Sequence, residues 1–174
     1  PLRHPDSVCN PTLLDPSLAG TKAESLAIGP DVNGVANAAL YVGGLKDGGI
    51  RRINNILDPN PRNQSVDIIA QTTDGRGING SMAFLGNDLY LPENRGLTVI
   101  QNAPACFALS CFPQQVVIPG LVFANSVASD GVDKVFVATN LVAPGAVGGV
   151  RGGPATQAVI YRYSASSNSA VLFE

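Results

Sequence analysis

Three oxygen-bearing side chains stand at the start of three short apolar segments and could together bind a metal ion. They are Glu24 before Ser-Leu-Ala, Asn79 before Gly-Ser-Met-Ala, and Asn125 before Ser-Val-Ala. A carboxylate and two amide oxygens are hard ligands, which suit Ca²⁺ better than zinc or copper. Asn and Ser at such positions also cap turns and hydrogen-bond backbone groups, so a purely structural role is the alternative. The pattern predicts a calcium site if the fold brings the three segments together.

A second chemical feature is the closely spaced pair Cys106 and Cys111. Pro104 and Pro113 flank this pair, and the segment carries no His or further Cys that would make it a zinc site. We expect a disulfide between the two cysteines, and hence an oxidising compartment, either outside the cell or in the periplasm. Two buried thiols are the alternative. Cys9 is left without a partner in this sequence.

Several other chemistries lack the residues that they need. The one histidine, His4, lies in a proline-rich stretch near the N-terminus, so the serines have no obvious base to activate them. The glycines between Gly145 and Gly153 follow no pattern of a dinucleotide-binding loop. The net charge of −2 and the scattered basic residues argue against nucleic-acid binding. No apolar run reaches the about 18 residues that span a bilayer, so we expect no transmembrane segment.

The elements that must position these residues are strands, because one pattern recurs three times. A polar turn precedes an apolar–aromatic–apolar segment centred on Tyr41, Tyr90 and Phe136, which lie 49 and 46 residues apart. No segment has helical apolar spacing, and 19 Gly and 13 Pro favour short strands joined by tight turns. Repeats of roughly 40 to 50 residues built from strands are typical of propeller blades. The sequence therefore predicts an all-β propeller in which these three aromatic residues, with Tyr161, form the core between blades.

The repeat also divides the chain. We expect an irregular N-terminal arm over residues 1–21 and propeller blades over the remainder, at about 22–75, 76–120 and 121–174. Gly29-Pro30 is expected to end the first strand. The predicted strands are Ser25–Ile28, Ala38–Gly43, Ile50–Asn54 and Val66–Gln71 in the first blade, Gly80–Leu85, Asp88–Leu91, Leu97–Gln101 and Gln115–Ile118 in the second, and Leu121–Ser129, Lys134–Thr139, Gln157–Tyr163 and Ala170 onward in the third.

Three to four four-stranded blades leave two possible architectures. One is a compact four-bladed ring, and the other is part of a larger propeller. An open array exposes strand edges that stick to neighbouring chains. We therefore expect further blades, supplied by the same protein or by a protein partner.

The second repeat resembles a known blade signature. Asn79-Gly-Ser-Met-Ala-Phe followed by Gly-Asn-Asp-Leu-Tyr-Leu is similar to the blades of the six-bladed superfamily that holds NHL-repeat proteins, gluconolactonases and paraoxonases. In the lactonase branches, a Glu and Asn residues at inner strands hold a catalytic calcium ion. The resemblance implies this role for Glu24, Asn79 and Asn125. The family's ligand set also includes an Asp that these residues do not supply, and its catalytic His has no counterpart beyond His4.

These considerations favour a secreted or periplasmic β-propeller that acts as a binding or assembly module. Its contacts would come from two rim loops, Ala143–Thr156 and Ala103–Gln114, because loops on a rigid scaffold carry recognition residues. The alternative is a calcium-dependent lactonase or esterase that uses the calcium site predicted above.

Overall fold

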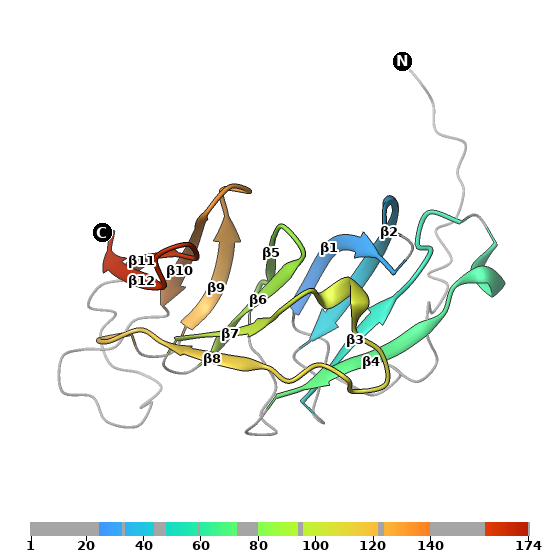
Figure 1. The fold of residues 1–174 in the computed structure, drawn as a ribbon, viewed down its shortest axis with the longest axis horizontal. Coiled ribbons are helices and arrows are strands. Elements are labelled where there is room, and N and C mark those ends of the chain that lie inside the picture. Colours follow the sequence, from blue (N-terminus) through green and yellow to red (C-terminus); the bar gives the residue numbers. More distant parts are fainter. Residues whose placement is uncertain are drawn as a thin grey trace, which may run out of the picture.

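The computed structural model describes residues 25–32, 34–43, 48–58, 60–72, 80–93, 96–121, 124–139 and 159–173. Within these ranges the protein is all-β, with three four-stranded antiparallel sheets and two single-turn 3₁₀ helices, η2 (Pro61–Asn63) and η3 (Ala103–Ala105) (Figure 1). The predicted arm over residues 1–21 lies outside the described residues.

Each sheet consists of four strands that follow one another in sequence and pair in sequence order. Sheet 1 contains β1 (Ser25–Asp31), β2 (Gly34–Gly43), β3 (Gly49–Ile53) and β4 (Val66–Gln71). Sheet 2 contains β5 (Ala83–Leu85), β6 (Asp88–Glu93), β7 (Gly96–Ile100) and β8 (Gln114–Val117). Sheet 3 contains β9 (Ala124–Ser129), β10 (Lys134–Thr139), β11 (Ile160–Ser164) and β12 (Ser169–Leu172).

Every predicted strand overlaps an observed one, but several predicted boundaries were wrong, among them the start of β2 at Gly34 instead of Ala38 and that of β9 at Ala124 instead of Leu121. Gly29-Pro30 does not end the first strand, since β1 continues to Asp31. β1 is an edge strand of sheet 1, where the missing N–H of a proline removes no ladder hydrogen bond. In sheet 2, β5 begins at Ala83 rather than at Gly80, because Gly80 has a φ of +116°, which is not extended backbone.

The sequence repeat corresponds to one repeated strand pairing. The aromatic residue of the second strand pairs with an alanine of the first strand in every sheet: Tyr41 with Ala27, Tyr90 with Ala83, and Phe136 with Ala128. The three sheets are therefore built on the same register, and residues counted from these alanines can be compared between sheets.

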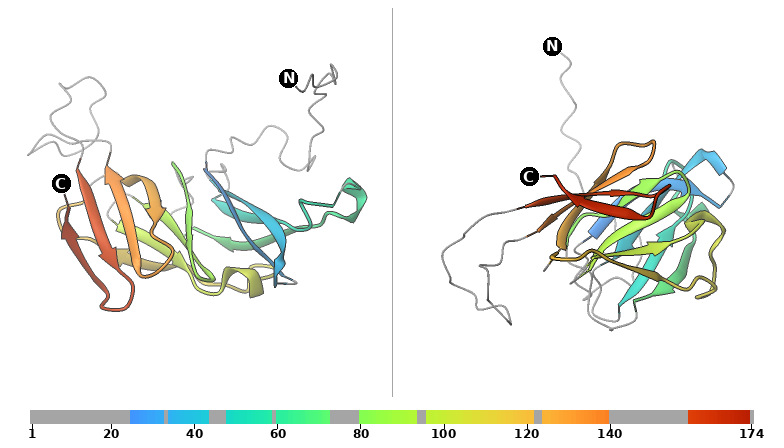
Figure 2. Two further views of the ribbon diagram at one scale, coloured as in Figure 1. Left: turned by 90° about the horizontal axis from the view of Figure 1, so that it is seen from above. Right: turned by 60° about the vertical axis from the view of Figure 1, so that its left-hand side comes forward.

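Successive side chains of a strand point to opposite faces, so each sheet has two faces. We call the face that carries the aromatic residue (Tyr41, Tyr90 or Phe136) the back face, and the other the front face. The sheets stand side by side with sheet 2 in the middle (Figures 1 and 2). The back face of sheet 1 packs on the front face of sheet 2, and the back face of sheet 2 packs on the front face of sheet 3.

The two contacts between sheets form two hydrophobic cores. The buried residues of the first core are Ala39, Tyr41, Ile50, Ile69 and Ala70 from sheet 1, and Met82, Leu89, Leu91, Ile100, Ala103 and Cys106 from sheet 2 and its loops. Those of the second are Tyr90, Leu97, Val99, Ile118 and Leu121 from sheet 2 and the turn after it, and Val127, Val135, Val137 and Tyr163 from sheet 3.

The prediction that the aromatic residues lie between sheets is confirmed in part. Tyr41 and Tyr90 are buried in the two cores, and Tyr161 packs against the second core while partly exposed. For Phe136 the prediction is not tested, because the back face of sheet 3 packs on no described sheet. The Phe136 ring instead contacts the ring of Phe173, with a centroid separation of 5.6 Å.

The first strands of sheets 2 and 3 meet directly. Ser81 forms a parallel bridge with Ser126. The Ser81 hydroxyl both donates to the carbonyl oxygen of Val127 and accepts from its N–H, each at 3.1 Å. A Cβ atom on Gly80 would lie 1.2 Å from the carbonyl oxygen of Asn125, so only glycine allows this close approach.

Candidate functional site

Of the three predicted calcium ligands, the structure describes Asn125. It lies partly buried in β9, and its side-chain oxygen accepts a hydrogen bond from the Ser126 hydroxyl at 3.3 Å. Glu24 and Asn79 fall outside the described residues. Counted back from the paired alanines, Glu24 and Asn125 occupy the same repeat position, whereas Asn79 stands one residue earlier in its repeat. The calcium site stays a prediction, and no cluster of three His, Cys, Asp or Glu side chains suited to a metal occurs in the described ranges.

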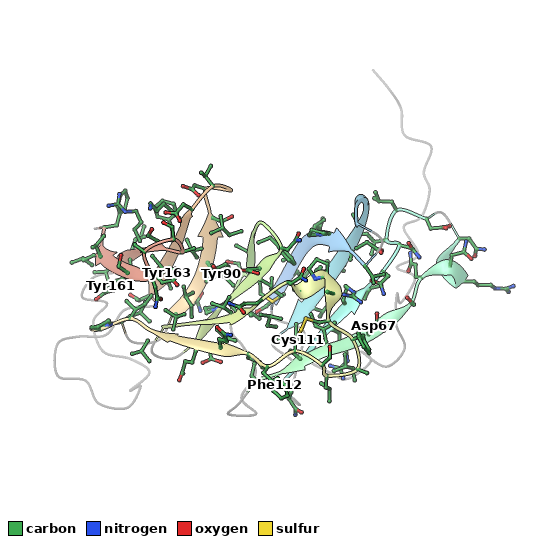
Figure 3. All side chains as sticks on the ribbon, in the orientation of Figure 1. Asp67, Tyr90, Cys111, Phe112, Tyr161 and Tyr163 are labelled. Carbon is green, nitrogen blue, oxygen red and sulfur yellow. A yellow bond between two sulfur atoms is a disulfide. The ribbon has the colours of Figure 1, made fainter. Side chains whose placement is uncertain are left out.

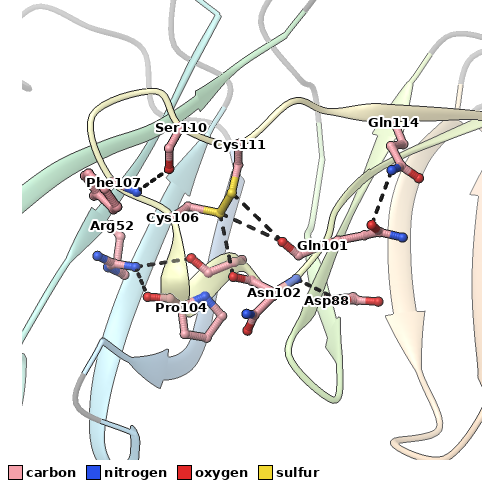
Figure 4. Close-up of a disulfide and its surroundings, with 11 residues drawn as sticks. Arg52, Asp88, Gln101, Asn102, Pro104, Cys106, Phe107, Ser110, Cys111 and Gln114 are labelled. Atoms are coloured by element: carbon pink, nitrogen blue, oxygen red, sulfur yellow. Dashed lines mark hydrogen bonds between the residues drawn. A yellow bond between two sulfur atoms is a disulfide. The ribbon is translucent and has the colours of Figure 1, made fainter.

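The predicted disulfide is present between Cys106 and Cys111, whose Cα atoms are 5.5 Å apart. It closes a turn within the connection between β7 and β8, residues 101–113, which we call the disulfide loop (Figure 4). Inside this turn the N–H of Phe107 donates to the Ser110 hydroxyl at 2.9 Å, and the N–H of Ser110 donates back to the carbonyl oxygen of Phe107 at 2.8 Å. The turn is therefore held by its own backbone as well as by the two sulfur atoms.

The disulfide loop leaves its own sheet and contacts sheet 1. The N–H of Leu109 donates to the carbonyl oxygen of Ile68 at 2.8 Å, and the N–H of Cys111 donates to that of Ile69 at 3.4 Å. Ile68 and Ile69 belong to β4, the outer strand of sheet 1. The loop therefore covers part of an edge that would otherwise present unpaired backbone groups.

Arg52 of β3 fixes the loop from the inside of the molecule. Its side chain is 1% exposed. One guanidinium nitrogen, Nη1, donates to the carbonyl oxygens of Ala103 at 3.1 Å and Pro104 at 2.5 Å (Figure 4). The other, Nη2, forms an ion pair with Asp67 at 2.8 Å, and the same carboxylate oxygen accepts from the Asn54 amide at 2.9 Å. A buried charge thus joins two strands of sheet 1 to η3.

Sequence reasoning missed this role of Arg52, although a signal was present. Arg51-Arg52 places two charges inside a predicted strand, and Asp67 stands in the strand predicted to follow it. Because side chains alternate between faces, one arginine of such a pair must point towards a packed face, where it needs partners. Which carbonyl groups those partners are depends on contacts more than fifty residues away in sequence.

The disulfide loop exposes apolar side chains. Cys106 and Ala103 are fully buried, whereas Phe107, Leu109 and Phe112 are exposed, Phe112 by 85%. Figure 3 shows Phe112 beside Cys111, on the rim of the molecule. Exposed aromatic side chains on a rigid support are typical of protein-binding surfaces.

A separate polar recess of about 700 Å³ lies between sheets 2 and 3. Its described lining includes Tyr90 and Tyr163, whose ring centroids are 6.2 Å apart, and the amides of Gln101, Gln114 and Asn168. The Tyr163 hydroxyl donates to the Asn168 side-chain oxygen at 3.0 Å. Burial raises the pKa of Tyr90 to about 12 and also raises the pKa of Tyr163, so both hydroxyls stay protonated at neutral pH. The recess therefore offers neutral hydrogen-bonding groups beside the carboxylate of Asp88, which also lines it.

The second predicted rim loop, Ala143–Thr156, lies outside the described residues. No helix in the described ranges has the length and apolar character needed to cross a membrane. Comparison of the chain with protein-family models, with curated proteins and with solved structures found no match. The case for a function therefore depends on the geometry described above.

Proposed function

We propose that this chain forms part of a β-propeller and acts, outside the cell or in the periplasm, as a protein-binding module whose contact surface is the disulfide loop. The observation that carries the proposal is the exposure of Phe107, Leu109 and Phe112 on a loop that is held in place from three sides. These are its own disulfide, the backbone bonds to β4 and the guanidinium of Arg52.

The repeated geometry supports the propeller architecture. Each sheet is a four-stranded antiparallel meander of the kind found in propeller blades. The three sheets share one register, and consecutive sheets pack front face on back face. The bridge between Ser81 and Ser126 brings the first strands of two consecutive sheets together, as expected for the inner strands of neighbouring blades.

Rigidity is what makes this loop suitable for binding. Ordering a flexible loop on association costs free energy, and a loop that is already ordered avoids that cost. Aromatic residues contribute much of the binding free energy at protein interfaces. The disulfide fits an oxidising compartment, where such bonds persist.

Site-specific photo-crosslinking tests this proposal. One variant carries a photoreactive amino acid in place of Phe112, and a control carries it in place of Val132, in the turn between β9 and β10. Both positions are 85% exposed, so they sample the surrounding proteins equally well. Irradiation with the envelope or secreted proteins of the producing cells should give a discrete adduct from position 112 and none from position 132.

A further variant tests whether the adduct depends on the exposed apolar side chains of the disulfide loop. Replacing Phe107 and Leu109 with Ser, while the photoreactive group stays at position 112, should remove the adduct without changing the circular dichroism spectrum. Equal labelling from positions 112 and 132, or no adduct at position 112, would contradict the proposed binding surface.

A further inference from the structure

The two outer sheets each leave one face uncovered by any described sheet. On the front face of sheet 1, Leu26 and Ile28 of β1 are 56% and 71% exposed, and Val66 and Ile68 of β4 are also exposed. Between them lie the buried side chains of Val42 and Ile53, with that of Arg51, which is also buried. Exposed apolar side chains on both outer strands of a sheet are unusual for a face in contact with water and mark an interaction site.

The shared register shows what covers this face elsewhere in the molecule. Leu26, Met82 and Val127 each directly precede the alanine that pairs with the aromatic residue. Met82 and Val127 are 5% and 4% exposed, because the back face of the preceding sheet covers them. Leu26 is 56% exposed, because no described back face packs on sheet 1. Leu26 therefore occupies a position that is buried under a neighbouring sheet in both other sheets.

The back face of sheet 3 shows the complementary situation. Phe136 occupies the position of Tyr41 and Tyr90, both of which are buried under a front face. Around Phe136 lie the half-exposed Phe173 and the guanidinium of Arg162, which stacks over the Phe173 ring at 5.6 Å from its centroid. Stacking keeps this charge over an aromatic surface, which offsets part of the cost of burying it under another sheet.

We propose that a second copy of this chain covers both faces, with the front face of sheet 1 of each copy packed on the back face of sheet 3 of the other. All sheet–sheet packing in the described ranges is front on back, and the new contacts would repeat it. Formed twice, the contact closes a ring of six sheets, within the range of about four to eight that propellers adopt. If the contact formed only once, one front face and one back face would stay exposed. Further copies could then add to them, and an open chain of copies would result. This inference rests on the propeller architecture proposed above.

Two double variants test the two faces separately. The front variant carries Leu26→Glu and Ile28→Glu, and the back variant carries Val171→Glu and Phe173→Glu. All four side chains are at least half exposed or nearly so, which keeps the effect on the folding of one copy small. Val132→Glu, in an exposed turn away from both faces, is the matched control.

Sedimentation equilibrium gives the mass of each species. The unmodified chain and the control should have twice the mass of the 17.9 kDa chain, and each variant alone should have the mass of one copy. A mixture of the two variants should form a one-to-one dimer, because the intact back face of the front variant can still pack on the intact front face of the back variant. That recovery would also demonstrate that both variants are folded.

Three results would overturn the inference. They are an unmodified chain with the mass of a single copy, a back variant that still dimerises through two like faces, and folded variants that fail to associate when mixed. None of these results bears on the disulfide loop, which the substitutions leave unchanged. Failure of this inference and failure of the proposed binding function are therefore distinguishable.

Discussion

Replacing Arg52 with Met tests whether a buried guanidinium stabilises the contact between sheet 1 and the disulfide loop. Met has a similar length but no donor, so the carbonyl oxygens of Ala103 and Pro104 lose their hydrogen bonds and Asp67 loses its ion pair. Removing one partner of a buried ion pair costs about 3–5 kcal/mol. The Asp67 side chain is 35% exposed and keeps its bond from the Asn54 amide, which places the cost at the lower end. We expect a loss of about 3 kcal/mol in the free energy of unfolding, more than a hundredfold in the folded-to-unfolded ratio.

Urea unfolding followed by circular dichroism measures this loss. Arg62→Met is the matched control, because Arg62 is exposed in η2 and its replacement should change the free energy of unfolding by less than about 0.5 kcal/mol. Asp67→Asn should also cost about 3 kcal/mol, because it leaves the 1%-exposed guanidinium without its counter-charge. A cost for Arg52→Met below about 1 kcal/mol, or one equal to that of the control, would refute the reasoning.

Three further predictions follow from other contacts. Gly80→Ala should cost well over the about 1 kcal/mol of backbone strain expected for Gly86→Ala, since a Cβ atom at position 80 would overlap a carbonyl oxygen, whereas position 86 has nothing within 4 Å. Urea unfolding of both variants measures the difference, and equal costs would exclude close packing at position 80. Replacing Cys106 and Cys111 with Ala should lower the free energy of unfolding by about 2 kcal/mol, as expected for a loop of this length. Dithiothreitol should then destabilise the natural protein but leave the variant unchanged. Burial raises the pKa of Tyr41 from 10 to about 12, so its contribution to stability should be present below pH 10 and lost as the pH rises towards 12. Unfolding curves across this range should show a smaller decline for Tyr41→Phe, and an equal decline would assign the effect to other groups.

The strands could be predicted from the sequence because their signal is local. A polar turn followed by alternating apolar residues defines a hairpin whatever surrounds it. The boundary at Gly29-Pro30 was wrong because a proline is tolerated in an edge strand, and edge position is a property of the whole sheet. Whether another sheet covers the Phe136 side chain likewise depends on the order of the sheets. The segment around Phe136 does not determine it.

The candidate site also combines features that could be predicted from the sequence with features that could not. The disulfide could be predicted, because two cysteines this close in a loop need only a turn to meet. The path of the loop across β4 and its attachment to Arg52 could not, because both join residues from different sheets. The exposure of Phe107 and Phe112 was also beyond the sequence, since an apolar residue in a loop is as readily buried as exposed.

The crossing of the disulfide loop onto β4 has a consequence for how the molecule can be shortened. Sheet 1 acquires the acceptors of Arg52 and the cover for its outer strand from residues that come about forty to fifty positions later in the chain. A fragment that stops after β4 would expose the apolar back face of sheet 1, which sheet 2 covers, next to a bare strand that attracts other strands. Such a fragment should precipitate, whereas one that extends through the β7–β8 connection should remain in solution.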